Sequence, residues 1–257
     1  MKKTRKIFAS LEFKIDQYFR SKSINIYYPY NKILAYKNLH KNQRCFIVGT
    51  GPSLNINQLD LLQNEITFSM NSIPLSFSKT NWRPTYYVIQ DTRAYNIFKD
   101  NLPSYAKKEI FIGINHRFNG IKMKKYTNHN FNKYCYYPLY LRPDENIYKI
   151  KFSDDCYKIV YDGTTVTYSI LQLAVYMGFS EIYLLGMDCD YTSTDKKHFI
   201  NYVTNFNTLA AENKMLYAYS LTNLYAKEHN IKIFNATTGG KLEIFPRVKL
   251  EDILNKK

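Results

Sequence analysis

The chain has 257 residues, 45% of them hydrophobic and 22% charged, which suits an α/β domain with a substantial core and excludes a disordered composition. Its net charge of +15 is concentrated at the amino terminus, where residues 1–44 hold eleven Lys or Arg and two acids. No stretch approaches the ~18 apolar residues that a membrane span needs, and residues 1–20 lack the apolar run of a signal peptide.

The first predicted element is a basic amphipathic helix over residues 5–20. The helical period places five apolar residues on one face: Phe8, Leu11, Ile15, Tyr18 and Phe19. We expect residues 1–43 to form a basic arm, irregular over 21–43. The helix fits peripheral contact of residues 1–20 with an anionic inner membrane, packing on the body, or contact with another subunit in a homo-oligomer.

From residue 44 the chain alternates strand-like and helix-like runs. This alternation predicts one Rossmann-like domain over residues 44–257, an α/β fold with a doubly wound, mostly parallel sheet. The expected strands are 44–49, 65–70, 85–90, 109–114, 136–141, 181–186 and 231–235. The expected helices are 56–62, 92–99, 166–177 and 209–229.

The chain has four cysteines, at Cys45, Cys135, Cys156 and Cys189. They form no C-x-x-C pair, and three of the four lie in or beside apolar runs. Buried, reduced thiols are the simplest interpretation, which predicts a cytoplasmic protein.

A glycine-rich turn follows the first expected strand, in the stretch RCFIVGTGPSLN. Gly49, Thr50 and Gly51 let the backbone approach an anion, and Ser53 is positioned to cap the next helix. The third glycine of a dinucleotide fingerprint is absent, and no P-loop motif occurs, so NAD binding and a P-loop NTPase are disfavoured. Contact with a nucleotide and a purely structural turn both remain open.

Polar residues follow the next strands and open one helix. Asn71 ends the second strand, and Gln90 and Asp91 end the third, at the edge where parallel sheets bind ligands. Thr164 and Thr165 open the helix of 166–177, where hydroxyls can hold a phosphate or simply cap the helix. For each group, a ligand contact and a local capping role are both open.

The segment after the sixth expected strand holds the chemistry-bearing side chains. Asp188 and Asp190 fit a role in orienting a sugar or binding Mg²⁺, Tyr191 a hydrogen bond to a leaving phosphate, and His198 a general base. The last strand leads into a further loop with Asn235, Gly239 and Gly240, which suggests close backbone approach to a ligand or a tight turn.

Five stretches resemble the MptE-like family of bacterial polysaccharide-locus proteins, labelled after the archaeal 6-hydroxymethylpterin diphosphokinase. They are FIVGTGPSLN, FSMNSI, PTYYVIQD, GTTVTYSILQLAVYMGFSEIYLLGMDCDY and IFNATTGGKLEIFPRV. The same stretches are more distantly similar to the sialyltransferases of glycosyltransferase family 42, which implies a GT-A-like variant of the Rossmann fold and a CMP-sugar donor with no required cofactor.

The sialyltransferase resemblance implies a role for several residues. Gly49, Gly51 and Ser53 would line the CMP phosphate site, and Asn71 would contact the nucleotide. Thr164 and Thr165 would lie near the phosphate or the donor's carboxylate. Tyr191 would support the leaving phosphate, and His198 would deprotonate the acceptor. The second tyrosine of that family is missing here, and its third-strand Asn is replaced by Gln90-Asp91.

We therefore expect an inverting glycosyltransferase that moves a nonulosonate, sialic-acid-like or Kdo-like sugar from its CMP form to a cell-surface glycan, as in capsule or lipopolysaccharide synthesis. The alternative is a diphosphokinase that uses ATP and Mg²⁺, with Asp188, Asp190 and Asp91 as metal ligands. A nucleic-acid-binding protein is disfavoured, because the charge lies in one arm and no binding motif occurs.

Overall fold

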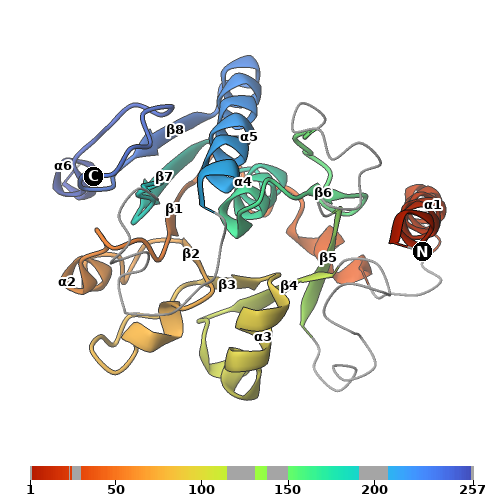
Figure 1. Ribbon diagram of the computed structural model, residues 1–257. Coiled ribbons are helices and arrows are strands. Elements are labelled where there is room, and N and C mark those ends of the chain that lie inside the picture. Colours follow the sequence, from red (N-terminus) through yellow and green to blue (C-terminus); the bar gives the residue numbers. More distant parts are fainter. Residues whose placement is uncertain are drawn as a thin grey trace.

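The computed structural model describes residues 2–22, 24, 30–114, 131–137, 150–190 and 208–255. These ranges form a parallel sheet of eight strands with helices on both faces (Figure 1). The strands are β1 (Arg44–Val48), β2 (Thr67–Met70), β3 (Tyr86–Ile89), β4 (Glu109–Ile114), β5 (Asn132–Tyr137), β6 (Val160–Tyr161), β7 (Glu181–Leu185) and β8 (Lys232–Asn235).

The order of the strands reverses at β1. The sheet runs β6-β5-β4-β3-β2-β1-β7-β8, so the chain adds strands outward on one side of β1 and then returns to its other side. Val48 of β1 is in register with Ser69 of β2 and with Leu185 of β7. The carboxyl ends of β1 and β7 therefore lie side by side at the point where the order reverses, which is where open α/β sheets bind ligands.

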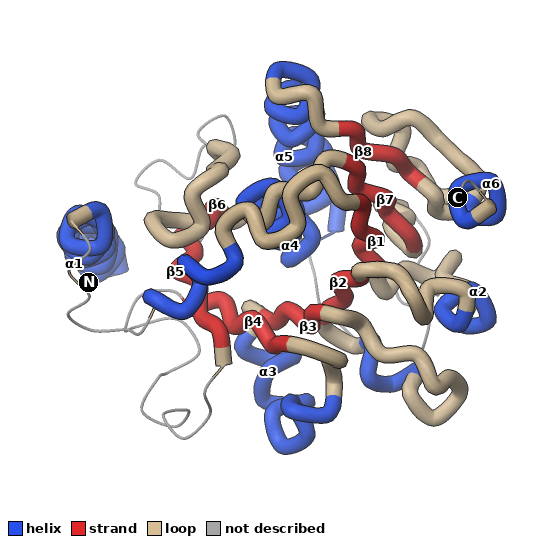
Figure 2. The backbone as a smooth tube through the Cα atoms, turned by 180° about the vertical axis from the view of Figure 1, so that it is seen from behind, coloured by secondary structure: helices blue, strands red, loops and turns tan. Residues whose placement is uncertain are grey.

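The helices form a layer on each face of the sheet (Figures 1 and 2). They are α1 (Lys2–Ser21), α2 (Ile56–Asp60), α3 (Thr92–Phe98), α4 (Val166–Tyr176), α5 (Thr208–Glu228) and α6 (Leu250–Leu254). Shorter 3-10 turns are η1 (Asn31–Tyr36), η2 (Ile73–Ser76) and η3 (Lys99–Ser104). α4 and α5 cover one face, and α2, α3 and α6 cover the other.

The core is split by the sheet because successive strand residues point to opposite faces. In β1, Cys45 and Ile47 join the apolar cluster under α4, whereas Phe46 and Val48 join the cluster under α3. All four side chains are fully buried. A continuous apolar run is the expected signature of a parallel strand covered on both faces.

α1 lies beyond the β5–β6 edge of the sheet (Figure 1). Its last turn is attached to the body by Arg20, whose guanidinium donates to the carbonyl oxygen of Lys158 and lies over the ring of Tyr30. No helix in the described ranges has the length and apolarity to cross a bilayer.

The doubly wound parallel sheet is confirmed, as are the four expected helices of the body, to within two residues at each end. The fifth strand was placed wrongly, because it begins at Asn132 and not at residue 136. β6 and α6 were missed, since two residues and five residues are too short to show a period. Tyr30 and Ile33, assigned to the arm, are buried in the core.

The described cysteine side chains fit the expectation from the sequence. Cys45, Cys156 and Cys189 are buried free thiols, and burial raises the pKa of each. The side chain of Cys135 lies outside the described part.

Candidate functional site

Two turns meet at the carboxyl ends of β1 and β7. The N–H of Gly49 donates to the carbonyl of Leu185 at 2.7 Å, and the N–H of Gly51 donates to the carbonyl of Gly186 at 3.0 Å. The turn of residues 49–53 therefore packs directly against residues 186–188, and both turns line the switch point of the sheet.

Close packing explains the two glycines of the first turn. A Cβ on Gly49 would lie 2.6 Å from the carbonyl oxygen of Gly186, and one on Gly51 would overlap the carboxylate of Asp188. Any larger residue at either position would push the two turns apart. The structural interpretation of this turn is thus supported, and ligand contact at Gly49, Thr50 and Gly51 stays a prediction.

The carboxylate of Asp188 is bonded to Ser53, one of the residues that were predicted to line a phosphate site. Its Oδ2 accepts hydrogen bonds from the hydroxyl of Ser53 at 2.9 Å and from the Ser53 N–H at 3.3 Å. Burial raises the pKa of this carboxyl, although the two bonds from Ser53 oppose the shift. The glycine-rich turn therefore already binds an anion, supplied by the chain itself.

The expected helix cap at Ser53 is wrong. Asn55 is the N-cap of α2, and its side-chain oxygen accepts from the N–H of Asn57 at 3.0 Å. Ser53 lies two residues too early, and its hydroxyl is bonded to Asp188.

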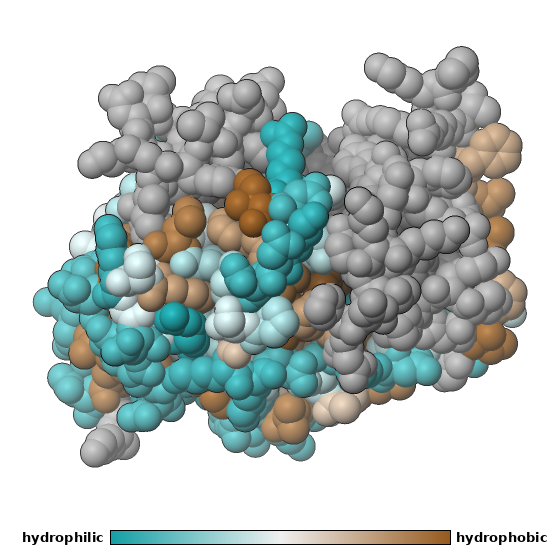
Figure 3. All heavy atoms as spheres, turned by 90° about the horizontal axis from the view of Figure 1, so that it is seen from below, coloured by the Kyte–Doolittle hydropathy of each residue, from teal (hydrophilic) through white to brown (hydrophobic). Residues whose placement is uncertain are grey.

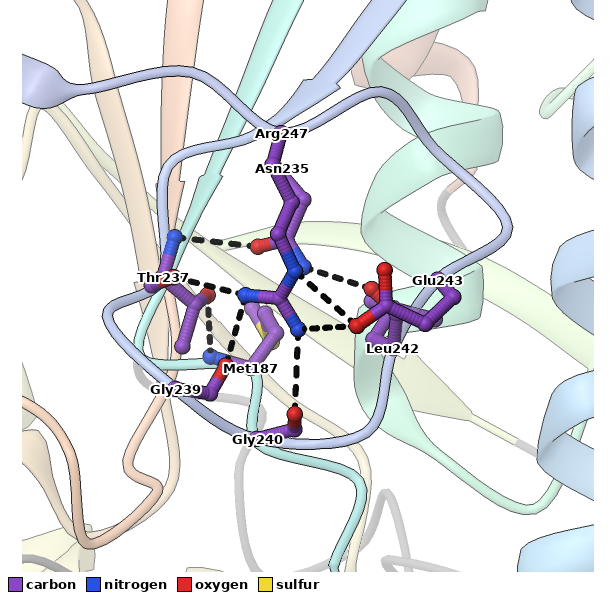
Figure 4. Close-up of polar contacts among 8 residues, drawn as sticks. All are labelled: Met187, Asn235, Thr237, Gly239, Gly240, Leu242, Glu243 and Arg247. Carbon is purple, nitrogen blue, oxygen red and sulfur yellow. Dashed lines mark hydrogen bonds and ion pairs between the residues drawn. The ribbon is translucent and has the colours of Figure 1, made fainter.

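The loop after β8 packs against the segment after β7, where it contacts Met187 (Figure 4). Gly240 approaches the backbone of Asp188 so closely that a Cβ would lie 2.6 Å from its carbonyl oxygen. The N–H of Lys241 donates to that carbonyl, and the N–H of Met187 donates to the hydroxyl of Thr237. These bonds fasten the loop to the segment that carries Asp188.

Arg247 holds this loop in shape (Figure 4). Its guanidinium donates to three backbone carbonyls, those of Thr237, Gly239 and Gly240, at 2.7–3.1 Å. It also pairs with the carboxylate of Glu243. Sequence reasoning left Arg247 out of the site, although its four-residue spacing from Glu243 beside two glycines was a usable signal.

Asn235, which was predicted to contact a ligand, is fully buried, and its side chain bonds to the same loop. Its amide donates to the carbonyl of Leu242, and its amide oxygen accepts from the N–H of Thr237. Both polar groups of the side chain are therefore bonded within the loop.

Asn71 has a polar atom that the fold leaves unsatisfied. Its backbone lies in the left-handed region, with φ +47°, and its carbonyl accepts from the hydroxyl of Tyr87 at 2.7 Å. Its side-chain Oδ1 is buried and has no hydrogen-bond partner among the described residues. Such an acceptor costs about 1–3 kcal/mol unless a donor reaches it, so this atom is suited to a ligand N–H or O–H.

The start of α4 lies over the same edge of the sheet. The hydroxyl of Thr167 contacts the sulfur atoms of Met70 and Met187, both at 3.5 Å, and so spans the ends of β2 and β7. Thr165 caps the helix by accepting from the N–H of Thr167. Thr164 has φ +69° and donates to the carbonyl of Gly163. The structure thus brings the predicted residues Thr164 and Thr165 to the edge that also holds Asn71.

Gln90 and Asp91 have partners within the fold. The buried Gln90 Oε1 accepts from the hydroxyls of Tyr134 and Ser169, at 2.9 and 2.7 Å. Asp91 caps α3 by accepting from the N–H groups of Arg93 and Ala94. The capping alternative is observed for Asp91, and a ligand contact by either residue stays a prediction.

Tyr191 and His198 lie outside the described residues, in the range 191–207. The last described residue before this range is Asp190, which forms an ion pair with Lys241 at 3.0 Å. Within the described part, no three His, Cys, Asp or Glu side chains gather as a metal site would require.

The sequence of the chain matches the model of one protein family. A family model described as 6-hydroxymethylpterin diphosphokinase MptE-like matches residues 21–194. No curated protein sequence matches the chain.

Two solved structures are similar at low identity. One is the MAf glycosyltransferase from Magnetospirillum magneticum AMB-1, with 16% identity and a TM-score of 0.49; the match covers 88% of this chain and 39% of that one. The other is the sialyltransferase CstII from Campylobacter jejuni in complex with a substrate analogue, cytidine-5'-monophosphate. It has 14% identity and a TM-score of 0.48, and the match covers 81% of this chain and 85% of that one.

Proposed function

The chain belongs to the MptE-like family, whose model covers residues 21–194, and we propose that it is a transferase that takes its group from a nucleotide-linked donor. The donor would lie at the carboxyl edge of the sheet, over the ends of β1, β2 and β7. The finer proposal is a glycosyltransferase that uses a CMP-sugar.

The unsatisfied amide oxygen of Asn71 carries this proposal. It is a buried acceptor at the switch-point edge, on a residue in the left-handed region. A nucleoside offers the matching donors, ribose hydroxyls and the amino group of cytosine. Strained backbone that the surrounding structure maintains is typical of ligand sites, which supports the same assignment.

The proposed chemistry uses three residues that follow β7: Asp188, Tyr191 and His198. The hydroxyl of the acceptor glycan attacks the anomeric carbon while the bond from that carbon to the phosphate oxygen breaks. CMP leaves with the electron pair, supported by a hydrogen bond from Tyr191, and the proton of the acceptor passes to His198. Attack opposite the leaving group inverts the anomeric centre. Asp188, held by Ser53, would orient a hydroxyl of the sugar.

The diphosphokinase named in the family description is the alternative. It would place Mg²⁺ on Asp91, Asp188 and Asp190. Each of these carboxylates has a partner in the structure: Asp91 caps α3, Asp188 accepts from Ser53, and Asp190 pairs with Lys241. Among the described residues, these three carboxylates do not gather into a group that could hold a metal ion, so the donor set does not fit a magnesium site and we derive no step through a metal.

A thermal-shift titration separates the two functions. We expect CMP to raise the melting temperature in the presence of EDTA, and UDP, GDP and ATP to have smaller effects, because a ligand that binds only the folded state stabilises it. Stabilisation by ATP that requires Mg²⁺ would contradict the glycosyltransferase proposal and favour the kinase.

A matched pair of asparagine variants tests the donor site. Asn71→Gly removes the amide with its unsatisfied oxygen and tolerates the positive φ, although glycine adds an entropic cost. We therefore expect no loss of stability and at least a tenfold loss of CMP affinity, about 1.4 kcal/mol. Asn230→Gly is the control, because Asn230 has φ +55° at the end of α5, away from the sheet edge. Equal CMP affinity of both variants by calorimetry would remove Asn71 from the site.

The role of His198 is tested by transfer activity. His198→Ala should lose at least a hundredfold in kcat for CMP release from a CMP-sugar with acceptor, because a general base contributes about 10²–10⁴-fold. His229→Ala is the control, since His229 is exposed at the end of α5 and stacks on Tyr225. Full activity of His198→Ala would assign the proton to another group.

A further inference from the structure

The described side chains of α1 expose an apolar stripe. Five large apolar residues are 47–64% exposed: Ile7, Phe8, Leu11, Ile15 and Tyr18. At 3.6 residues per turn they fall within an arc of about 100° on the helix. Hydrophobic side chains gather along the edge of the molecule on which α1 lies (Figure 3).

α1 is fastened to the body only near its end, as far as its described side chains show. Arg20 is fully buried, donates to the carbonyl of Lys158 and lies 4.9 Å from the ring centroid of Tyr30. The side chains of the stripe, which lie between two and thirteen residues before Arg20, are exposed. The body therefore holds α1 in place while leaving its apolar face open.

The charge of residues 2–22 favours one kind of partner for this face. Residues 2–22 hold seven Lys or Arg and two acids, a net charge of +5. A second copy of this helix would bring two strongly positive segments together, which is unfavourable. An anionic lipid surface is complementary, because it attracts the cations while the interface takes up the apolar side chains.

We propose that α1 lies in the headgroup region of an anionic membrane, with the stripe of Ile7, Phe8, Leu11, Ile15 and Tyr18 facing the acyl chains. Phe8 and Tyr18 stand about 15 Å apart along the axis and mark the two ends of the embedded face. Aromatic side chains favour this depth of the bilayer. Membrane binding through α1 does not depend on the proposed glycosyl transfer.

Vesicle co-sedimentation of the full chain tests the proposal. We expect binding to phosphatidylcholine vesicles that contain 30% phosphatidylglycerol at 50 mM salt, and at least tenfold weaker binding to pure phosphatidylcholine. Raising the salt to 500 mM should also weaken binding, because the attraction between exposed charges is screened. Failure of the wild type to bind the anionic vesicles would overturn the proposal.

Two double variants with the same change in charge isolate the stripe. Leu11→Glu with Ile15→Glu should reduce binding at least tenfold. Leu61→Glu with Leu224→Glu, at positions 53% and 55% exposed outside α1, should keep binding within about threefold. Equal binding by both would show that net charge alone acts, and would contradict insertion of the stripe.

A spectroscopic variant gives a second readout that does not depend on the double variants folding. The native Trp82 is fully buried and supplies a constant background. In Tyr18→Trp, we expect a blue shift of emission on addition of anionic vesicles. An unshifted emission maximum would overturn the proposal. So would light scattering that shows a dimer of the wild type and a monomer of the Leu11→Glu, Ile15→Glu variant, since the stripe would then be a contact between copies.

Discussion

At the scale of single residues, the glycines and Asp188 show how closely the site is packed. Gly51 and Gly240 approach Asp188 from two directions, one at its carboxylate and one at its backbone. The carboxylate itself is held by Ser53. The position of one acidic side chain is therefore set by three segments that come from the ends of β1, β7 and β8.

Two neighbouring glycines provide a matched test of this packing. Gly239 and Gly240 have φ +77° and +71°, but a Cβ would meet nothing within 4 Å at Gly239 and would lie 2.6 Å from Asp188 at Gly240. Gly239→Ala should cost about 1–2 kcal/mol of unfolding free energy from backbone strain alone. Gly240→Ala should cost measurably more in urea denaturation. Equal losses would contradict the close approach.

The pH dependence of stability tests the environment of Asp188. Because its pKa is raised, the folded chain binds a proton there more readily, and wild-type stability falls as pH rises through that pKa. Asp188→Asn keeps an acceptor for Ser53 without the charge. We expect it to melt higher than the wild type at pH 8, with the gap closing toward about pH 4, near the ordinary pKa of Asp.

Asp190→Asn is the control for this measurement. It removes the ion pair with Lys241 and should gain no stability. If Asp188→Asn instead melts lower than the wild type at pH 8, by a margin that closes toward about pH 4, the ionised carboxylate stabilises the fold.

At the scale of elements, the loop between β8 and α6 acts as a unit with the segment after β7. Arg247 bonds three of its carbonyls, and the Asn235 side chain bonds the N–H of Thr237 and the carbonyl of Leu242. The backbone of Asn235 also pairs with Pro246 and Val248 at the far end of the loop. The loop carries the N–H of Lys241 to the carbonyl of Asp188. Its order therefore bears on the geometry of the site as well as on stability.

Replacement of Arg247 should loosen this unit. In Arg247→Met we expect faster amide hydrogen exchange over residues 237–242 and weaker nucleotide binding, because three carbonyls lose their donor. Glu243→Gln is the control, since it keeps the guanidinium and its backbone bonds. Unchanged exchange in Arg247→Met would show that the loop is held by other contacts.

His40 joins the segment before β1 to the sheet. It lies within hydrogen-bond distance of the Tyr86 hydroxyl, at 2.7 Å, and stacks on Phe179. Burial lowers its pKa, so its contribution to stability is complete above about pH 6.5 and is lost as pH falls toward the folded pKa. His40→Gln should flatten the fall in melting temperature between pH 7 and 5; an unchanged slope would assign that fall to other groups.

At the scale of the whole molecule, the sheet order sets both the stability and the site. β1 is central and buried on both faces, whereas β6 is a two-residue edge strand. We expect native-state hydrogen exchange to be slowest in β1 and β7 and fastest in β6, because central strands open only on global unfolding. Fast exchange in β1 would contradict the observed topology.

Much of this could be read from the sequence because local patterns carry the period of each element. The alternation of strands and helices specifies a parallel sheet, and a parallel sheet brings Gly49, Asn71 and Asp188 to one edge. Residues 115–160 are rich in Tyr and Asn and lack a clear period, so the sequence predicts their elements poorly. The strand expected there, 136–141, starts four residues later than the observed β5.

The sequence by itself thus determined the fold class and the edge where polar residues gather. Only the tertiary structure decided which of them bond to each other: Ser53 to Asp188 across 135 positions, and Thr167 to Met70 across 97. Partners so far apart are chosen by packing and not by local propensity. The same packing decided that the glycine-rich turn binds the chain's own carboxylate and that Asn71 is left with an unsatisfied oxygen.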